Sequence, residues 1–313
     1  MKRQNLLWIA VCALGLVGVL LAWSDDTLSG NWTMQKSDVP GKVEFGLMYH
    51  QGNHSSNNET DWPLAAFPGL DITKPGRQDV HFTITRDAGV FQCEGFLNNG
   101  EGAGIFHFTP DPKFPGEMKA IGFSGVDRDD QYAMAVHDVS IAFAKEMKSE
   151  NLTDLDVDKL LAFRIHGVNK QFIDDLRAAG LKISDSDQLV AFRIHGVTPE
   201  TVRYVKQAGY DPEPDTLVAM RIHGVTPEWM QQMKQRGYDH IEMDQYIAFR
   251  IHGVSPEFID EVQKLGYKHP DPDQLIAMRI HGVTPQFIAD MKARGMQDLS
   301  IDQLVSLKIH GIN

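Results

Sequence analysis

The pattern of apolar and polar positions in the C-terminal two-thirds of the chain repeats about every 29 residues. Arg-Ile-His-Gly recurs five times and Lys-Ile-His-Gly once, and their histidines are separated by 29, 28, 29, 29 and 29 residues. These histidines are His166, His195, His223, His252, His281 and His310, and His137 extends the row 29 residues upstream. Repeats of this length are typical of stacked helical hairpins, so residues 111–313 are predicted to form an α-solenoid of seven two-helix repeats.

Each unit carries the signals that begin and end a first helix. In the unit that opens at Ser255, the serine is a helix N-cap, and Pro256 occupies the first turn, where its missing N–H donor is not needed. Phe258 and Val262 then fall on one face of the helix. Gly266 is expected to end the helix in the left-handed conformation.

A second helix is expected in each unit, beginning near Asp271 in one unit and at Ser300 in the last. Its body is apolar on most sides, so we expect it to be the more buried of the two. Helices of about ten residues are marginal when isolated in water, so their stability must come from stacking. The first unit departs from the pattern, because Pro115 and Gly116 are expected to interrupt its first helix.

Residues 27–110 show a period of two instead. Residues 42–49 and 80–85 alternate apolar and polar positions, as half-buried strands do. Residues 90–96 and 104–108 resemble the strands of a hairpin that turns through Leu-Asn-Asn-Gly-Glu-Gly-Ala. This region is predicted to be a small antiparallel all-β domain of five or six strands, either a sandwich or an open barrel.

Residues 51–63 are strongly polar and are predicted to form a loop. The polar side chains beside Trp62 make this segment a candidate ligand loop for a sugar or a peptide. The alternative interpretation is a solvated connection between two strands.

An uncharged apolar run from Leu6 to Trp23 follows Lys2 and Arg3. As a helix it would measure about 27 Å, close to the thickness of a bilayer core. The small residues Ala22 and Ser24 favour a cleaved signal peptide, whereas the length of the run favours an uncleaved membrane anchor. Both interpretations of residues 1–26 place the rest of the chain outside the cytoplasm, in the periplasm or cell envelope.

Composition and charge narrow the possible partners. The formal net charge is −12, which disfavours a nucleic-acid binder because such a protein needs a basic face to meet phosphates. Cys93 is the only cysteine after the apolar run, so no disulfide framework is expected there. No catalytic constellation is recognisable, and we expect neither an enzyme nor a cofactor.

The recurring arginine and histidine are the candidate interaction or repeat-signature residues. A shared metal is not expected, because neighbouring repeats lie about 10 Å apart whereas zinc ligands lie about 2 Å from the ion. The simpler interpretation is that these cations cap the C-terminal end of their own helix. A pH-sensitive stack is the alternative. The residues are Arg164, His166, Arg193, His195, Arg221, His223, Arg250, His252, Arg279 and His281.

The repeat Arg-Ile-His-Gly-Val-Thr-Pro is similar to one found in uncharacterised bacterial envelope proteins. Some of these proteins look to be joined to membrane metallopeptidases of the beta-lactam-sensor type. The zinc-binding His-Glu-x-x-His motif of that sensor family is absent here, so the resemblance does not imply protease activity.

These features favour an extracytoplasmic module that presents its solenoid to a protein or peptide partner, with envelope sensing or signalling as the setting. Two alternatives stay open. The β domain could bind a carbohydrate or small ligand with the solenoid as a spacer, or the chain could be an enzyme with an unrecognised site.

Overall fold

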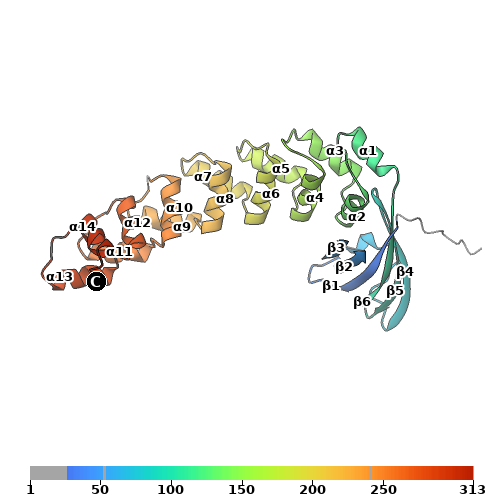
Figure 1. The fold of residues 1–313 in the computed structure, drawn as a ribbon, viewed down its shortest axis with the longest axis horizontal. Helices are drawn as coiled ribbons and strands as arrows, with labels where there is room; N and C mark the ends of the chain where they lie inside the picture. The colour runs from blue at the N-terminus through green and yellow to red at the C-terminus, as the bar shows by residue number, and fades with distance from the viewer. Residues whose placement is uncertain (1–26, 52–53, 240, 313) are drawn as a thin grey trace, which may run out of the picture. The chain divides into compact units, whose positions relative to one another are not determined.

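The computed structural model describes residues 27–51, 54–239 and 241–312. The predicted signal peptide or anchor, residues 1–26, lies outside this part of the chain. Within the described ranges, none of the helices combines the length and the apolar character needed to cross a membrane. The chain divides between Asp111 and Pro112 into two compact units, one of strands and one of helices (Figure 1).

The first unit contains a six-stranded antiparallel sheet with the strand order β3-β2-β1-β6-β5-β4. Every segment predicted as a strand is part of it, and the turn between β5 and β6 is formed by Asn99 and Gly100, both with positive φ. Its strands are β1 (Leu28–Lys36), β2 (Lys42–Gln51), β3 (His54–Pro63), β4 (Arg77–Arg86), β5 (Gly89–Asn98) and β6 (Glu101–Pro110).

The sheet is strongly curled around an aromatic core. Trp32 of β1 and Phe82 of β4 have ring centroids 5.3 Å apart, although β6 and β5 lie between their strands in the sheet. Three strand spacings in a flat sheet would separate them by about 14 Å. Phe45 and Phe67 complete the cluster. The concave side of the sheet is therefore filled with side chains, all of them buried.

The prediction of a loop over residues 51–63 is wrong. Gln51 ends β2, and His54–Pro63 forms the edge strand β3, whose backbone pairs with β2 along its whole length. An edge strand tolerates many polar side chains because one of its sides faces solvent. Trp62 is 4% exposed, packs against Phe45 at 5.3 Å and donates its indole N–H to Thr60 Oγ1 at 3.0 Å.

The second unit consists, in its described residues, of seven consecutive helix pairs. The first helices of the pairs are α1 (Phe114–Ala120), α3 (Ile141–Ser149), α5 (Lys170–Ala178), α7 (Pro199–Gln207), α9 (Pro227–Lys234), α11 (Pro256–Lys264) and α13 (Pro285–Ala293). The second helices are α2 (Arg128–Val136), α4 (Val157–His166), α6 (Ser186–His195), α8 (Pro214–His223), α10 (Met243–His252), α12 (Pro272–Ile280) and α14 (Ile301–Ile309).

The pairs stack into two layers. Each second helix packs against the second helices of the neighbouring pairs, and the first helices form their own row. Figure 1 shows α4, α6 and α8 together on one side of the stack and α3, α5 and α7 on the other. Neighbouring second helices approach each other more closely than neighbouring first helices, which makes their layer the inner side of the stack.

Local sequence explains the ends of these helices. Ser255 Oγ accepts a hydrogen bond from the Phe258 N–H at 3.2 Å, and Ser300 and Gln303 form a capping box, as predicted. The expectation that Pro115 and Gly116 interrupt the first helix is wrong. Both lie in the first turn of α1, where proline needs no hydrogen-bond donor, and the helix simply begins later than in other units.

Candidate interaction surface of the helical repeats

Four of the five signature arginines join two repeats. The Nε–H of each of these four donates to the carbonyl oxygen of the histidine one repeat earlier, at the C-terminal end of the preceding second helix, whereas Arg193 makes no such hydrogen bond among the described residues. The distances are 3.1 Å from Arg164 to His137, 3.4 Å from Arg221 to His195, 2.9 Å from Arg250 to His223 and 3.3 Å from Arg279 to His252. These four arginines therefore cap the negative dipole end of the neighbouring repeat's helix and not of their own.

Most of these arginines also lie over an aromatic ring from the first helix of their own pair. Arg193 lies 3.8 Å from the centroid of Phe172, and burial lowers the pKa of this guanidinium from its ordinary value. Arg250 lies 5.4 Å from Trp229. In α7 the equivalent position is Thr201, which forms a capping box with Thr198, so this repeat has no ring for its arginine.

The signature glycine is required by the same contact. Gly224 has a φ of +69°, which other residues rarely adopt. A Cβ at this position would lie 2.8 Å from Arg250 Nη2. Glycine therefore both ends the helix and leaves room for the next repeat's arginine.

A second cation contact joins the first helices. The Nζ of Lys148 donates to the Ile121 carbonyl at 2.6 Å, and that of Lys292 donates to the Leu265 carbonyl at 2.7 Å, each one repeat earlier. Tyrosines act in the opposite direction: Tyr238 donates its hydroxyl to the Pro270 carbonyl of the next repeat at 2.8 Å, and burial raises its pKa to about 12. Both layers are thus linked through backbone carbonyls.

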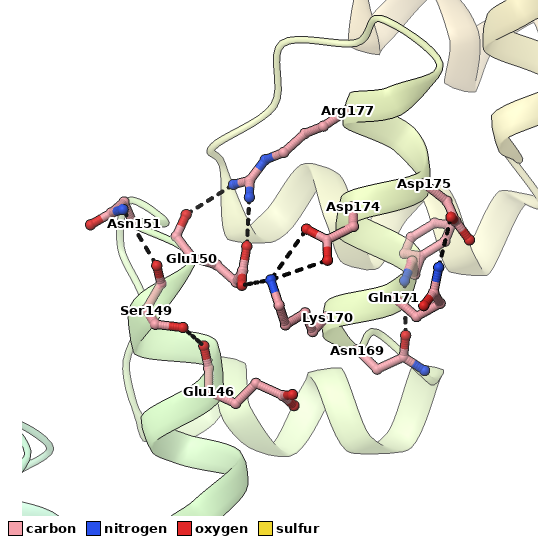
Figure 2. A network of polar contacts seen from close by, with 11 residues as sticks. Glu146, Ser149, Glu150, Asn151, Asn169, Lys170, Gln171, Asp174, Asp175 and Arg177 are labelled. Atoms are coloured by element: carbon pink, nitrogen blue, oxygen red, sulfur yellow. Dashed lines mark hydrogen bonds and ion pairs between the residues drawn. The ribbon is translucent and has the colours of Figure 1, made fainter.

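One junction carries an additional ionic network (Figure 2). The carboxylate of Glu150, whose side chain is 4% exposed, accepts from Arg177 Nη1 at 2.5 Å and from Lys170 Nζ at 2.7 Å. Hydrogen bonds to the carboxylates of Glu150 and Asp174 raise the pKa of Lys170. Sequence reasoning missed this network because no other repeat has a glutamate at that position.

The isoleucine of each signature points into solvent. We call this set the isoleucine ladder, and its members are 52–59% exposed, an unusual state for a large aliphatic side chain repeated at one structural position. In the first repeat the equivalent residue, Val136, is buried. The ladder comprises Ile165, Ile194, Ile222, Ile251, Ile280 and Ile309.

Each isoleucine belongs to a longer stripe along its helix. Three and four residues before it stand a small and an aliphatic residue, such as Ala219 and Val218 in α8, both half-buried. Seven residues before it stands an exposed aspartate. The aspartate row is Asp158, Asp187, Asp215, Asp244, Asp273 and Asp302. Together the aspartate row, the aliphatic positions and the isoleucine ladder form a surface that we call the ladder face.

The signature histidines differ from the arginines. The carbonyls of His195, His223 and His252 accept arginine hydrogen bonds. The rings of five signature histidines have no hydrogen-bond partner among the described residues: His166, His195, His223, His252 and His281. The stacking contacts therefore do not use these rings. Burial, with a further contribution from Arg164, lowers the pKa of His137 in the first repeat.

The structure thus separates the residues singled out from the sequence. Four of the arginines bond across the junctions while their residues stay partly exposed, each of the five histidines follows a ladder isoleucine in the chain, and Trp62 lies in the core of the other unit. Cys93 is also buried, which raises the pKa of its thiol to about 12. In the described residues, no group of three or more His, Cys, Asp or Glu side chains is placed to hold a metal ion.

The isoleucines and the aspartate row were missed, although a signal for them exists in the sequence. A helix that is apolar on most sides can have an exposed apolar face as well as a buried one. Asp, Ala and Ile recur at fixed spacing on one side of the second helix.

The described residues of the first unit include an open depression on the outer face of its sheet. It is lined by Asn31, Met48, Phe96, Ala103 and Ile105, and its volume is about 750 Å³. Comparisons of the chain with models of protein families, with characterised proteins and with solved structures find no match.

The arginine contacts predict that the same substitution lowers the free energy of unfolding by different amounts in different repeats. Arg250→Ala removes a 2.9 Å hydrogen bond and a cation–π contact, and we expect the free energy of unfolding to fall by about 2 kcal/mol. Arg221→Ala removes a 3.4 Å hydrogen bond but no cation–π contact. It should therefore lower the free energy of unfolding by less than about 1 kcal/mol. Urea unfolding monitored by circular dichroism measures both, and equal costs would contradict the assignment.

The ionic network predicts that Glu150→Gln destabilises the protein by about 1–3 kcal/mol, because Arg177 and Lys170 lose their shared acceptor charge. The matched control is Glu146→Gln, which changes an exposed glutamate in α3, the helix that Glu150 caps, and should be neutral. Thermal melts of the two variants provide the comparison. A network without energetic weight would leave both variants as stable as the parent.

Proposed function

We propose that the protein is an exported or membrane-anchored interaction module whose ladder face holds a segment of a partner protein at the cell envelope. The observation that carries the proposal is the isoleucine ladder. Six isoleucines occupy one position in successive repeats and are all about half exposed. The arginine, histidine carbonyl and glycine of the same signature account for the stacking, so the stack itself gives no reason for these isoleucines.

Exposed apolar surface that extends over several repeats is typical of a binding surface, because isolated soluble proteins rarely maintain it. Repeat stacks bind elongated partners along the side made by one helix layer. The ladder face lies on the inner layer and runs through six repeats, which supports a long, narrow ligand. A catalytic role is not part of the proposal.

The cellular setting is proposed from the sequence. The apolar run of residues 6–23 supports export or anchoring, and the similarity of the repeat to those of bacterial envelope proteins supports a role in sensing or signalling there. The acidic net charge of −12 supports a protein partner over a nucleic acid.

The second candidate function is ligand binding by the β unit, and its site would have to lie elsewhere than the predicted loop around Trp62. Trp62 is buried and cannot contact a ligand, and the concave side of the sheet is filled by aromatic side chains. The depression around Met48 and Ile105 is a candidate there, since both side chains are exposed.

Affinity capture after crosslinking in the native cells tests the proposal. Ile194, Ile222 and Ile251 are replaced together by Asn, and a control variant carries Gln207→Asn, Gln231→Asn and Glu261→Asn on the first helices. We expect one partner protein to be captured by the parent and the control and lost from the isoleucine variant. Matched melting curves establish that the three proteins are equally folded.

If the isoleucine variant captures the same partner as efficiently as the parent, the ladder face is not the binding surface. The same capture with Met48→Asp and Ile105→Asp then examines the β unit.

A further inference from the structure

The ladder face also specifies the conformation and charge of the segment it would bind, an inference that rests on the proposed function. Its apolar sites occur once per repeat, and helices packed side by side lie about 8–10 Å apart. A ligand that follows the face must therefore present one apolar side chain at about this interval, always on the same side.

Two regular backbones meet this condition. A polyproline II helix places every third residue on one side at an interval of about 9.3 Å. An α-helix places every seventh residue on nearly the same side, at about 10.5 Å. A β-strand does not, because its residues at spacing three point to opposite sides.

The histidine rings distinguish a polyproline II ligand from an α-helical one. Five imidazoles, on His166, His195, His223, His252 and His281, are without a hydrogen-bond partner in the described structure and stand beside the ladder at one per repeat. A polyproline II segment has no internal hydrogen bonds, so each turn offers free carbonyl oxygens to such donors. The carbonyls of an α-helix are already used within the helix.

Charge supplies the third requirement. The aspartate row runs along one edge of the ladder face, with Asp215, Asp244 and Asp273 exposed in successive helices. On the other edge Arg250 and Arg279 are exposed, but their guanidinium groups already contact a carbonyl and the rings of Trp229 and Phe258. The complementary ligand therefore carries cations on the side that faces the aspartates.

We propose that the ladder face binds a basic, proline-rich segment of a partner protein in the polyproline II conformation. One aliphatic side chain per turn packs against each isoleucine, one backbone carbonyl per turn accepts from a histidine ring, and lysine or arginine faces the aspartate row. Six repeats correspond to about 18 residues of ligand. A second copy of this chain is a poor occupant, because an inner face of a curved stack is not complementary to itself.

The probe is the synthetic peptide (Ile-Pro-Lys)6, fluorescently labelled, titrated with the full-length protein and followed by anisotropy. We expect saturable binding that weakens with fewer triplets and with added salt. The control peptides are (Ile-Pro-Glu)6, a shuffled peptide of identical composition, and a lysine- and alanine-based helix with isoleucine at every seventh residue. Binding by any of them at the level of (Ile-Pro-Lys)6 overturns the proposal.

Variants separate the three contacts. Two triple variants should each lower the affinity for the peptide by about tenfold or more. The aspartate triple carries Asp215→Asn, Asp244→Asn and Asp273→Asn, and the histidine triple carries His223→Phe, His252→Phe and His281→Phe. The control triple on the first helices, Gln207→Asn, Gln231→Asn and Glu261→Asn, should bind as the parent does. Unchanged affinity in the histidine or aspartate triple contradicts the corresponding contact.

The outcomes also separate this inference from the proposed function. Suppose that partner capture depends on the isoleucines but that (Ile-Pro-Lys)6 binds no better than the shuffled peptide. This result overturns the polyproline II inference and still supports the ladder face as an interaction surface. Partner capture that is unchanged when the isoleucines are replaced contradicts the proposed function itself. If the variant with Ile194→Asn, Ile222→Asn and Ile251→Asn binds the peptide as tightly as the parent, the inference is contradicted whatever the capture experiment shows.

Discussion

The helical unit depends on one contact, the hydrogen bond from a cationic side chain to the exposed carbonyls at the end of the previous repeat's helix. Helices of about ten residues leave a large share of their backbone N–H and C=O groups without a partner inside the helix. Arg250 supplies a donor to the end of α8, and Lys292 does the same in the other layer for α11. Each repeat therefore completes its predecessor, which is why no single pair is expected to be stable alone.

This arrangement divides a four-residue signature between two roles. In Arg250-Ile251-His252-Gly253, the arginine, the histidine carbonyl and the glycine build the junctions, while the isoleucine and the imidazole stay on the surface. A repeat selected for stacking alone has no reason to keep an exposed isoleucine in six successive units. The proposed function and the polyproline II inference both start from that residue.

Local chemistry made much of the fold predictable. Caps such as Ser255 and Ser300, the terminating glycines and the 29-residue period act within a few residues, and the structure has helices where they predict them. The strand β3 was missed because its polar edge is stabilised by backbone pairing with β2, a contact that its own side chains do not encode. The first turn of α1 was misjudged because proline was treated as a break and not as a first-turn residue.

The candidate site was less predictable for a similar reason. The sequence identified Arg250 and His252 as special, but capping of the preceding helix and not their own is a property of the stack. The same holds for Glu150, whose partners Lys170 and Arg177 come from the next repeat. Which face of an apolar helix remains uncovered can be decided only when its neighbours are in place.

The most direct test of the account is site-specific photocrosslinking in the native cells, with a photoreactive residue introduced at Ile222 or, as the control, at Gln231 on the opposite layer. The account predicts a crosslinked partner protein from position 222 and none from position 231, with the crosslinked peptide of the partner rich in proline and lysine. Crosslinking of the same partner from position 231 and not from position 222 would contradict it, because the binding surface would then lie on the first helices.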